Sequence, residues 1–254
     1  MQIGFIGTGT IAAAMVEGLH TIGGAPATLV SPRSEALSRA LAERFPNVRR
    51  ASSNAEVATA DIVVLAMRPA QVQQALAGLT FGPHQTLVSL VAGLPLAEVQ
   101  ALAPHSPVCR VVPLPGIARG EGPITVFPRL PDVVALLEPL GDLLVTTSEA
   151  ALNMGGISAF MSSYFELQAA LIRTAEAAGV PEPEARTYVT SLLSMLATTA
   201  RRTPPEEFGK LVIEHQTKGG LNERVRDTLL AAGWFVAPAK AFDEINRLGW
   251  KKLG

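Results

Sequence analysis

The residues whose spacing points most clearly to chemistry lie near the N-terminus, in the segment GFIGTGTIAAAM. Gly7, Gly9 and Ala12 fit the pattern G-x-G-x-x-A, directly after a short apolar strand and at the start of a helical pattern. In this pattern the first glycine permits a tight turn, the second lets a pyrophosphate approach the backbone, and the third small residue lets the helix pack closely on the strand. The helix N-terminus then offers unpaired N–H groups and a positive dipole end to phosphates. The segment predicts a dinucleotide-binding turn; the alternative is a glycine-rich turn that holds no ligand.

The residues that follow the second expected strand, in LVSPRSEA, indicate which dinucleotide would bind. An NAD-binding site has a carboxylate here for the ribose 2′-hydroxyl, but this segment has no acid before Glu35. Ser31, Arg33 and Ser34 instead offer two hydroxyls and a guanidinium group, which suit a 2′-phosphate. The segment therefore favours NADP(H) over NAD(H), unless Arg33 is an ordinary solvated residue at the start of a helix.

Two later strand ends are expected at the same edge of the sheet, in VVLAMRPAQ and SLVAGLPL. Ligands of open α/β sheets bind outside the carboxyl ends of the strands, so these turns should flank the cofactor. Arg68 is either a neighbour of a phosphate or ribose or a plain solvated turn residue. The predicted cofactor-binding residues are Gly7, Thr8, Gly9, Thr10, Ile11, Ala12, Ser31, Arg33, Ala66, Met67, Arg68, Pro69, Ala92 and Gly93.

A second candidate site lies far along the chain, in the segment HQTKGGLNERV. Its two glycines can expose backbone N–H groups, and the helix expected after them points its positive end at the same place, which suits a carboxylate. Alternatively, the segment is a helix–helix turn with a glycine cap. His215 is either a proton donor or a structural histidine. We predict catalytic roles for Thr217, Lys218 and Asn222, and substrate contacts for Gly219, Gly220 and Leu221.

Composition excludes several other classes of protein. The chain has 254 residues, a formal net charge of −1 and scattered basic residues, which argues against nucleic acid binding. No apolar run reaches the about 18 residues of a membrane span. Hydrophobic residues make up 48% of the chain, and this excess favours a buried parallel sheet together with an interface in a homodimer or larger homo-oligomer.

The histidines and the cysteine do not form a recognisable catalytic or metal-binding group. The four histidines, His20, His84, His105 and His215, are isolated, so no metal site is expected. Cys109 is the only cysteine, and its apolar surroundings in SPVCRVV favour a buried structural role over a nucleophilic one. A single cysteine also excludes an internal disulfide and favours a reducing compartment, which we expect to be the cytoplasm.

Hydrophobic periodicity predicts an α/β fold with two domains. An N-terminal Rossmann-like domain, residues 1–149, would have a doubly wound, mostly parallel sheet, and an all-α domain would follow over residues 150–254. The expected strands span 2–6, 27–31, 61–66, 86–91, 107–112, 124–127 and 143–147. The expected helices span 11–23, 34–45, 70–77, 150–178, 183–202, 206–214, 221–232 and 238–248.

The order of these motifs resembles the pyrroline-5-carboxylate reductase family over nearly the whole chain. After the fingerprint and the two strand-end turns come RVVPLPGIARGEGPITVF and a long helix containing FELQAALIRTAEAAGV, which is similar to the family around Glu166, Ala177 and Gly179. The resemblance implies an NAD(P)H-binding domain and a helical domain that interleaves with a second subunit. It also implies reduction of a cyclic imino acid to proline.

Three segments depart from the family pattern. Val112–Gly116 replaces Met-Pro-Asn-Thr-Pro, so an asparagine near the nicotinamide is lost, and Met154–Phe160 replaces Ser-Gly-Ser-Gly-Pro-Ala-Tyr. Thr217–Asn222 replaces Ser-Pro-Gly-Gly-Thr-Thr. The resemblance places the last threonine of that loop at the substrate imine nitrogen, a position that Asn222 holds here.

The sequence therefore predicts an NADPH-dependent reductase of a C=N bond in a small carboxylate-bearing substrate, with 1-pyrroline-5-carboxylate and its product proline as the leading pair. An NADP oxidoreductase that acts on another acceptor, a deazaflavin or a keto acid, is the first alternative. A non-catalytic nucleotide-binding regulator is the second.

Overall fold

The computed structural model describes residues 1–248 and divides them into two compact units. The first unit contains residues 1–156 and the second spans residues 157–247. The boundary expected after residue 149 falls at the start of a 3₁₀ segment, η4 (Glu149–Phe160), which continues into the second unit.

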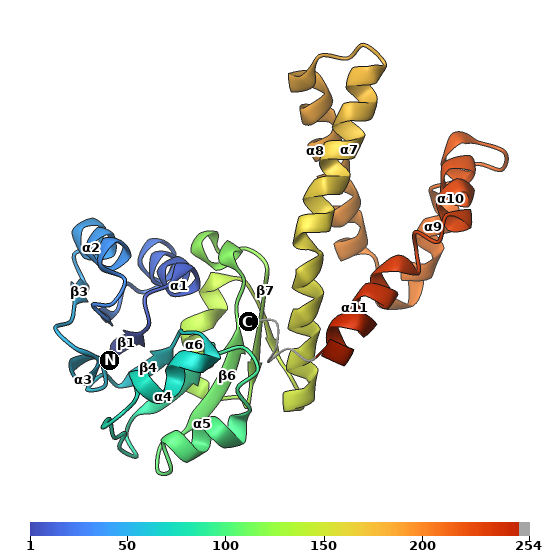
Figure 1. Ribbon diagram of the computed structural model, residues 1–254. Helices are drawn as coiled ribbons and strands as arrows, with labels where there is room; N and C mark the ends of the chain where they lie inside the picture. Colours follow the sequence, from blue (N-terminus) through green and yellow to red (C-terminus); the bar gives the residue numbers. More distant parts are fainter. Residues whose placement is uncertain (249–254) are drawn as a thin grey trace. The chain divides into compact units, whose positions relative to one another are not determined.

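An eight-stranded sheet forms the first unit, with the order β3-β2-β1-β4-β5-β6-β7-β8 (Figure 1). All neighbouring strands are parallel except β6 and β7, which are antiparallel, so the predicted doubly wound, mostly parallel sheet is confirmed. Because β2 and β4 lie on opposite sides of β1, the order of strands reverses there, and a crevice opens at the carboxyl ends. The strands are β1 (Gln2–Ile6), β2 (Ala27–Val30), β3 (Val48–Arg50), β4 (Ile62–Leu65), β5 (Thr86–Ser89), β6 (Val108–Val112), β7 (Pro123–Phe127) and β8 (Asp142–Val145).

Helices cover both faces of the sheet, and alternate residues of each strand pack against opposite helical layers. Ile3 and Phe5 of β1 point to the face covered by α1 (Thr10–Thr21), α2 (Glu35–Arg44) and α6 (Pro131–Leu137). Ile6 joins the core on the other face, with α3 (Asn54–Val57), α4 (Val72–Ala75) and α5 (Leu96–Leu102). Burial on both faces explains the continuous apolar runs of the central strands. Short 3₁₀ segments, η1 (Pro69–Gln71), η2 (Pro115–Arg119) and η3 (Glu138–Leu140), complete the unit.

Several short elements differ from the sequence expectation. The strand β3 was not expected, because its sequence Val-Arg-Arg has one apolar residue and two charges. The helices α3 and α6 were also not expected, since neither exceeds seven residues and periodicity needs a longer window. The helix expected over 150–178 is 3₁₀ in its first part, where Gly155 and Gly156 lower helix propensity.

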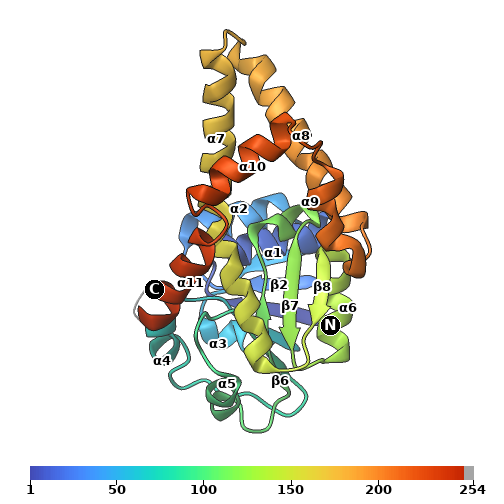
Figure 2. The same ribbon diagram turned by 90° about the vertical axis from the view of Figure 1, so that its right-hand side faces the viewer.

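Helices alone form the second unit. The helices α7 (Met161–Ala177) and α8 (Glu182–Arg202) run side by side as an antiparallel hairpin (Figures 1 and 2). The expected helix over 206–214 is divided into η5 (Pro205–Lys210) and α9 (Leu211–Glu214), and α10 (Leu221–Ala231) and α11 (Ala237–Leu248) follow. None of the described helices is both long and apolar enough to cross a membrane.

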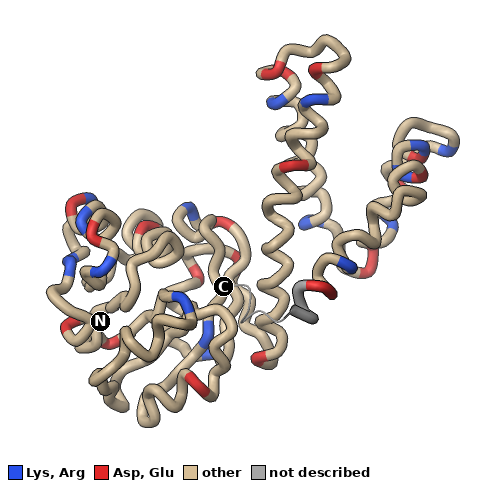
Figure 3. The backbone as a smooth tube through the Cα atoms, in the orientation of Figure 1, with Lys and Arg blue, Asp and Glu red and all other residues tan. Residues whose placement is uncertain are grey.

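The second unit has almost no hydrophobic core of its own. Among residues 157–244, only Ala185 and Val189 are buried apolar residues. Large apolar side chains are instead exposed on several helices, among them Phe165, Tyr188 and Ile213. Charges do not interrupt α8 between Thr187 and Ala200, a stretch that is uncharged in Figure 3. A unit of this length that buries so little apolar surface needs another surface to cover it.

A half-buried histidine links the last turn of α1 to the start of β2. His20 Nε2 lies 3.0 Å from Thr28 Oγ1, and the Thr28 hydroxyl donates to Pro26 O at 2.9 Å, so the imidazole donates through Nε2–H. Its ring also packs against Phe45, with the ring centroids 5.2 Å apart. Burial lowers the pKa of His20 below its ordinary value of 6.5.

We therefore expect stability to fall as the pH drops below the ordinary histidine range. In the unfolded chain His20 takes up a proton near about pH 6.5, while the folded state resists protonation to a lower pH, so acid favours the unfolded state in that window. Urea unfolding at about pH 7.5 and about pH 5.5 should show a smaller loss of stability for His20→Gln than for the unmodified protein. Equal losses in both proteins would contradict this role for His20.

Candidate functional site

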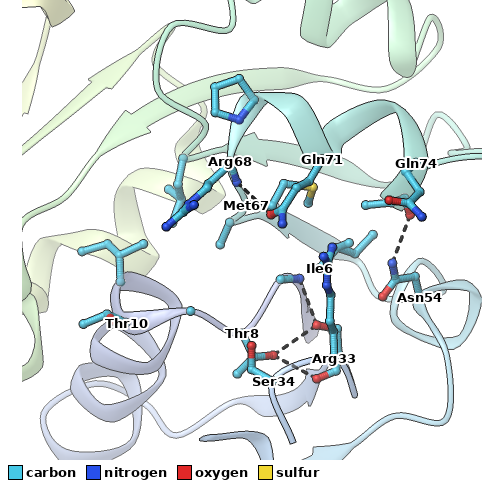
Figure 4. Close-up of a pocket in the computed structure, with 18 of the residues that line it drawn as sticks. Ile6, Thr8, Thr10, Arg33, Ser34, Asn54, Met67, Arg68, Gln71 and Gln74 are labelled. Carbon is cyan, nitrogen blue, oxygen red and sulfur yellow. Dashed lines mark hydrogen bonds between the residues drawn. The ribbon is translucent and has the colours of Figure 1, made fainter. Parts of the chain in front are cut away.

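A cavity of about 1100 Å³ lies at the carboxyl ends of β1, β2, β4 and β5. Figure 4 shows it between the turn after β1 and the turn after β4, with Arg33 extending into it from the end of β2. This is the crevice expected where the strand order reverses. Of the residues predicted to bind the cofactor, all except Ala12 and Gly93 line the cavity.

The turn after β1 has the geometry that the glycine pattern predicts. Gly7 has φ +95°, and a Cβ atom there would lie 2.4 Å from the carbonyl oxygen of Ala66, so any larger residue would clash with the end of β4. A Cβ on Gly9, in contrast, would meet no atom within 4 Å, so this backbone is open to a ligand. Ala12 has its side chain fully buried in the core beneath α1, where its small size serves helix–sheet packing. Only its backbone N–H is left for the predicted contact with the cofactor.

The N-terminus of α1 faces this turn with unpaired backbone donors. The first backbone hydrogen bond of the helix runs from Ala13 N to Gly9 O at 2.9 Å, so the N–H groups of Thr10, Ile11 and Ala12 have no partner within the helix. The first turn contains no acidic residue, and no side chain caps it. A pyrophosphate fits this position because the N–H groups and the helix dipole both favour negative charge.

Ser31 holds the turn rather than facing outward. It is fully buried, its Oγ accepts a hydrogen bond from Gly7 N at 2.9 Å, and its carbonyl oxygen accepts one from Thr8 Oγ1 at 3.0 Å. The two hydroxyl groups also lie 3.1 Å apart. These contacts fasten the end of β2 to the turn after β1. The hydroxyl that we expected at a 2′-phosphate is thus occupied, and Ser31 is a positioning residue.

The end of β2 supplies two other polar groups to the cavity. Arg33 is exposed and lines it, as predicted. Ser34, whose hydroxyl the sequence also offers to a 2′-phosphate, lines it too and stands at the N-cap of α2 with its side chain free of any capping hydrogen bond. A guanidinium, a hydroxyl and a helix N-terminus together suit a phosphate group.

The turn after β4 forms the opposite side of the cavity. Ala66, Met67, Arg68 and Pro69 all line it, and Arg68 N donates to Gln71 Oε1 at 3.3 Å. Three amide side chains that sequence analysis missed, those of Asn54, Gln71 and Gln74, lie at the same edge (Figure 4). Asn54 Nδ2 donates to Ala75 O at 3.0 Å and so joins the start of α3 to α4. Sequence offered no signal for Asn54, because it follows the unexpected strand β3.

Past β5, the turn is fixed by an ion pair within the first unit. Ala92 lines the cavity and Gly93 does not, so the contact of Gly93 with the cofactor stays a prediction. Glu149 Oε1 accepts hydrogen bonds of 2.6 Å from both Leu96 N and Arg110 Nη1. Burial alone would raise the pKa of Glu149, but these two hydrogen bonds and the charge of Arg110 lower it overall. The carboxylate therefore stays ionised and fastens the residues after Ala92 to β6.

The loop over residues 215–222 belongs to the second unit and caps its own helix. Gly219 has φ +74°, and its N–H donates to Glu223 Oε2 at 2.5 Å, while Gly220 N donates to Thr217 O at 2.7 Å. The expectation that both glycine N–H groups are bare is thus wrong. The donors that remain are those of the first turn of α10, which includes Leu221.

Side chains in this loop divide between internal and outward roles. Asn222 Nδ2 donates to His215 O at 2.6 Å, and His215 Nδ1 lies 2.8 Å from Leu211 O, which gives His215 the structural role. Thr217 and Lys218 are exposed. The Asn222 oxygen is not used in that contact and is available as an acceptor.

Other reactive groups give no competing site. Cys109 is fully buried in β6, and burial raises the pKa of its thiol to about 12, so it is a structural cysteine as predicted. Among the described residues, no three His, Cys, Asp or Glu side chains converge as metal ligands would.

The fold and the cavity together define a Rossmann-like dinucleotide-binding protein. Comparison with known proteins agrees with that class: residues 2–93 match the family model described as NADP oxidoreductase, coenzyme F420-dependent. A pyrroline-5-carboxylate reductase of Streptococcus pyogenes has the same fold, with a TM-score of 0.82 at 21% identity over 96% of each chain. A pyrroline carboxylate reductase of Plasmodium falciparum, solved with NADP bound, superposes with a TM-score of 0.80 at 17% identity, over 96% of this chain and 95% of the other.

Curated sequences extend the comparison to the family. The pyrroline-5-carboxylate reductase of Pseudomonas aeruginosa is 36% identical over 152 residues, which are 56% of this chain and 54% of that protein. That of Corynebacterium melassecola is 26% identical over 219 residues, which are 80% of this chain and 81% of that protein. The chain thus aligns with about half the length of the Pseudomonas relative. The names of these relatives agree with the resemblance seen in the motifs, since both are pyrroline-5-carboxylate reductases.

The Ser31 contacts predict how a change there affects both stability and cofactor binding. Ser31→Ala leaves the Gly7 N–H without its acceptor, which should lower the free energy of unfolding by about 1–3 kcal/mol. The loosened turn should also weaken NADPH binding by roughly 10-fold. Urea unfolding and fluorescence titration measure the two effects. Ser52→Ala, a change after β3 and outside the cavity, should leave NADPH binding unaltered; a similar loss there would show that Ser31 has no special role.

Proposed function

We propose that the protein is an NADPH-dependent reductase of the C=N bond in a small cyclic imino acid, with 1-pyrroline-5-carboxylate as substrate and proline as product. The observation that carries the proposal is the cavity at the β1 switch point, with an open glycine backbone, unpaired donors of α1 and Arg33 around it. The named relatives support the choice of substrate.

In this proposal the chain binds and orients, and the cofactor provides the reducing equivalent. NADPH, when bound, supplies a hydride to the imine carbon, and the ring nitrogen ends with one additional proton. The turn from Gly7 to Thr10 binds the pyrophosphate, while Arg33 and Ser34 bind the 2′-phosphate. The turns at Met67 and Ala92 border the rest of the dinucleotide.

The glycine loop of the second unit is assigned to the acceptor. We infer that the first-turn N–H groups of α10 and the Lys218 ammonium hold the substrate carboxylate. The Asn222 amide or the Thr217 hydroxyl then contacts the ring nitrogen. Glu223 already accepts the Gly219 N–H, so the substrate carboxylate is assigned to the first-turn N–H groups of α10 and not to Gly219.

A spectrophotometric assay of NADPH consumption tests the proposed function. The panel contains 1-pyrroline-5-carboxylate, its six-membered analogue, 2-keto acids and a deazaflavin, and proline is identified as the product of the first. Turnover with the cyclic imines supports the proposal. Turnover with only the deazaflavin or a keto acid overturns it in favour of another NADP oxidoreductase, and NADPH binding without any turnover points to a regulator.

Variants at Asn222 test the assignment of the acceptor loop. Asn222→Ala should lower kcat by roughly 10-fold or more, the effect of one lost hydrogen bond in the transition state, with NADPH affinity unchanged. Asn222→Thr restores a hydroxyl of the kind that the family resemblance implies here and should retain most activity. Equal losses of turnover and NADPH affinity in the alanine variant contradict this role.

We also propose that the helical unit assembles into a homodimer or a larger homo-oligomer, in the cytoplasm, where the lone thiol stays reduced. The support is the scarcity of buried residues over 157–244 together with exposed apolar side chains such as Phe165, Tyr188 and Ile213. A second copy of the same unit provides complementary apolar surface, and the subunits then interleave.

Light scattering coupled to size-exclusion chromatography should give at least twice the chain mass of 26.7 kDa. Phe165, which is 64% exposed on α7, supplies the test variant: Phe165→Glu should lower the mass toward that of the monomer, because a charge is costly in an apolar interface. Gln73→Glu, an exposed change on α4, should have no effect. A monomeric unmodified protein would refute the assembly.

A further inference from the structure

Arg50, the last residue of β3, reaches from the edge of the sheet to the loop that carries Arg33 and Ser34. We propose that Arg50 is a positioning residue for the cofactor: it fixes this loop so that Arg33 and Ser34 meet a 2′-phosphate, and it thereby sets the preference for NADP(H) over NAD(H). The inference rests on the part of the proposed function that puts a dinucleotide in the cavity. It does not depend on the identity of the acceptor.

The contacts of Arg50 bracket the loop from both sides. Its Nη2 donates to Pro32 O at 3.2 Å, directly before Arg33, and its Nε donates to Ser38 Oγ at 3.1 Å, in the first part of α2. Ser38 is fully buried, and its hydroxyl donates in turn to Glu35 O at 3.1 Å. One planar guanidinium therefore sets the distance between the end of β2 and the start of α2.

These contacts matter because the loop has few other constraints. Arg33 and Ser34 line the cavity; Ser34 makes no capping hydrogen bond, and Arg33 is exposed. Ser31 is tied to the turn after β1 and so fixes only the first residue of the loop. The guanidinium of Arg50 fixes the residues on both sides of Arg33 and Ser34. A site that is held in its binding geometry loses less entropy when a ligand binds.

The local charge also suits a phosphate, despite an acidic residue beside it. Glu35 opens α2, and Arg39 holds its carboxylate through Nε and Nη2, at 2.9 and 2.7 Å. The hydrogen bond and charge of Arg39, followed by the charge of Arg50, lower the pKa of Glu35. The carboxylate is thus paired within α2, and Arg33 and Arg50 leave the loop with a positive balance that a 2′-phosphate satisfies.

The neighbouring Arg49 provides a matched control. Successive side chains of a strand point to opposite faces, and Arg49 forms an ion pair with Glu56 in the segment after β3. A backbone hydrogen bond from Ser52, followed by the hydrogen bond from Arg49, lowers the pKa of Glu56 to about 2, so this pair stays charged. Arg49 has the same charge and belongs to the same strand, but its partner Glu56 lies in α3 and not in the loop after β2.

Binding of NADPH and NADH to the full chain, measured by fluorescence titration or calorimetry, tests the inference. Arg50→Met should weaken NADPH binding by roughly 10-fold and NADH binding by less than about 2-fold. The ratio of the dissociation constant for NADH to that for NADPH, which measures the preference for NADPH, should therefore fall. Arg50→Lys keeps the positive charge but not the planar guanidinium with its two contacts, and should lose part of the preference for NADPH over NADH. Arg49→Met should leave the ratio unchanged.

Ser38→Ala is the second variant, for use if Arg50→Met does not fold; it removes one of the two anchors of Arg50 and should lower the ratio in the same direction. An unchanged ratio in Arg50→Met and Ser38→Ala, or equal losses for both cofactors, overturns the inference. The inference is also overturned if the unmodified protein binds NADH as tightly as NADPH. No imine is present in these binding measurements, so they do not depend on the proposed reaction. If the protein prefers NADPH in them as expected but shows no turnover in the NADPH-consumption assay, the proposed reaction is refuted and the role of Arg50 still stands.

Discussion

The close approach of three backbone segments at the β1 switch point is the constraint on which the rest of the structure depends. The turn at Gly7 lies against the carbonyl of Ala66 at the end of β4, at a distance that leaves no room for a side chain. Ser31, at the end of β2, holds the same turn from the other side through the Gly7 N–H. The three strand ends are thereby locked together, and α1 leaves the turn with its unpaired N–H groups directed into the cavity. Positive potential there comes from backbone geometry before any charged side chain is added.

Side chains then give this general phosphate site its preference. The first acid after β2, Glu35, is paired with Arg39, and so it does not occupy the position where an NAD site would present a free carboxylate. Arg33 and Ser34 reach the cavity, while Arg50 and Ser38 support the loop from behind. The same division recurs at the turn after β5, where Ala92 lines the cavity and Glu149 with Arg110 holds the following residues. In both places the residue that lines the cavity is held in position by hydrogen bonds or an ion pair between residues that do not line the cavity.

The helical unit follows a different physical logic. Among the described residues its helices bury little against one another, and many of their large apolar side chains are exposed. Its glycine loop is nevertheless well ordered by its own contacts, through Glu223 on Gly219, Thr217 on Gly220 and Asn222 on His215. Local order in the loop and the absence of a local core are compatible, because loop hydrogen bonds fix conformation while apolar burial supplies most of the free energy of folding.

The sequence alone determined the architecture of the first unit, the location of its cavity and the preference expected at the end of β2. These follow from local patterns: glycine spacing, apolar runs with the length of a buried strand, and the order of strands and helices. It did not reveal β3, α3 or α6, which are too short and too weakly patterned to be recognised without their neighbours. Tertiary structure alone decided that Ser31 faces the turn rather than a phosphate, that Ala12 packs in the core, and that Asn54, Gln71 and Gln74 border the cavity. It also paired Arg50 with Pro32 and Ser38, and the glycine N–H groups with partners in their own loop. The reason is that a hydrogen-bonding group takes the partner that folding brings near it, and residue type and spacing specify the group but not that partner.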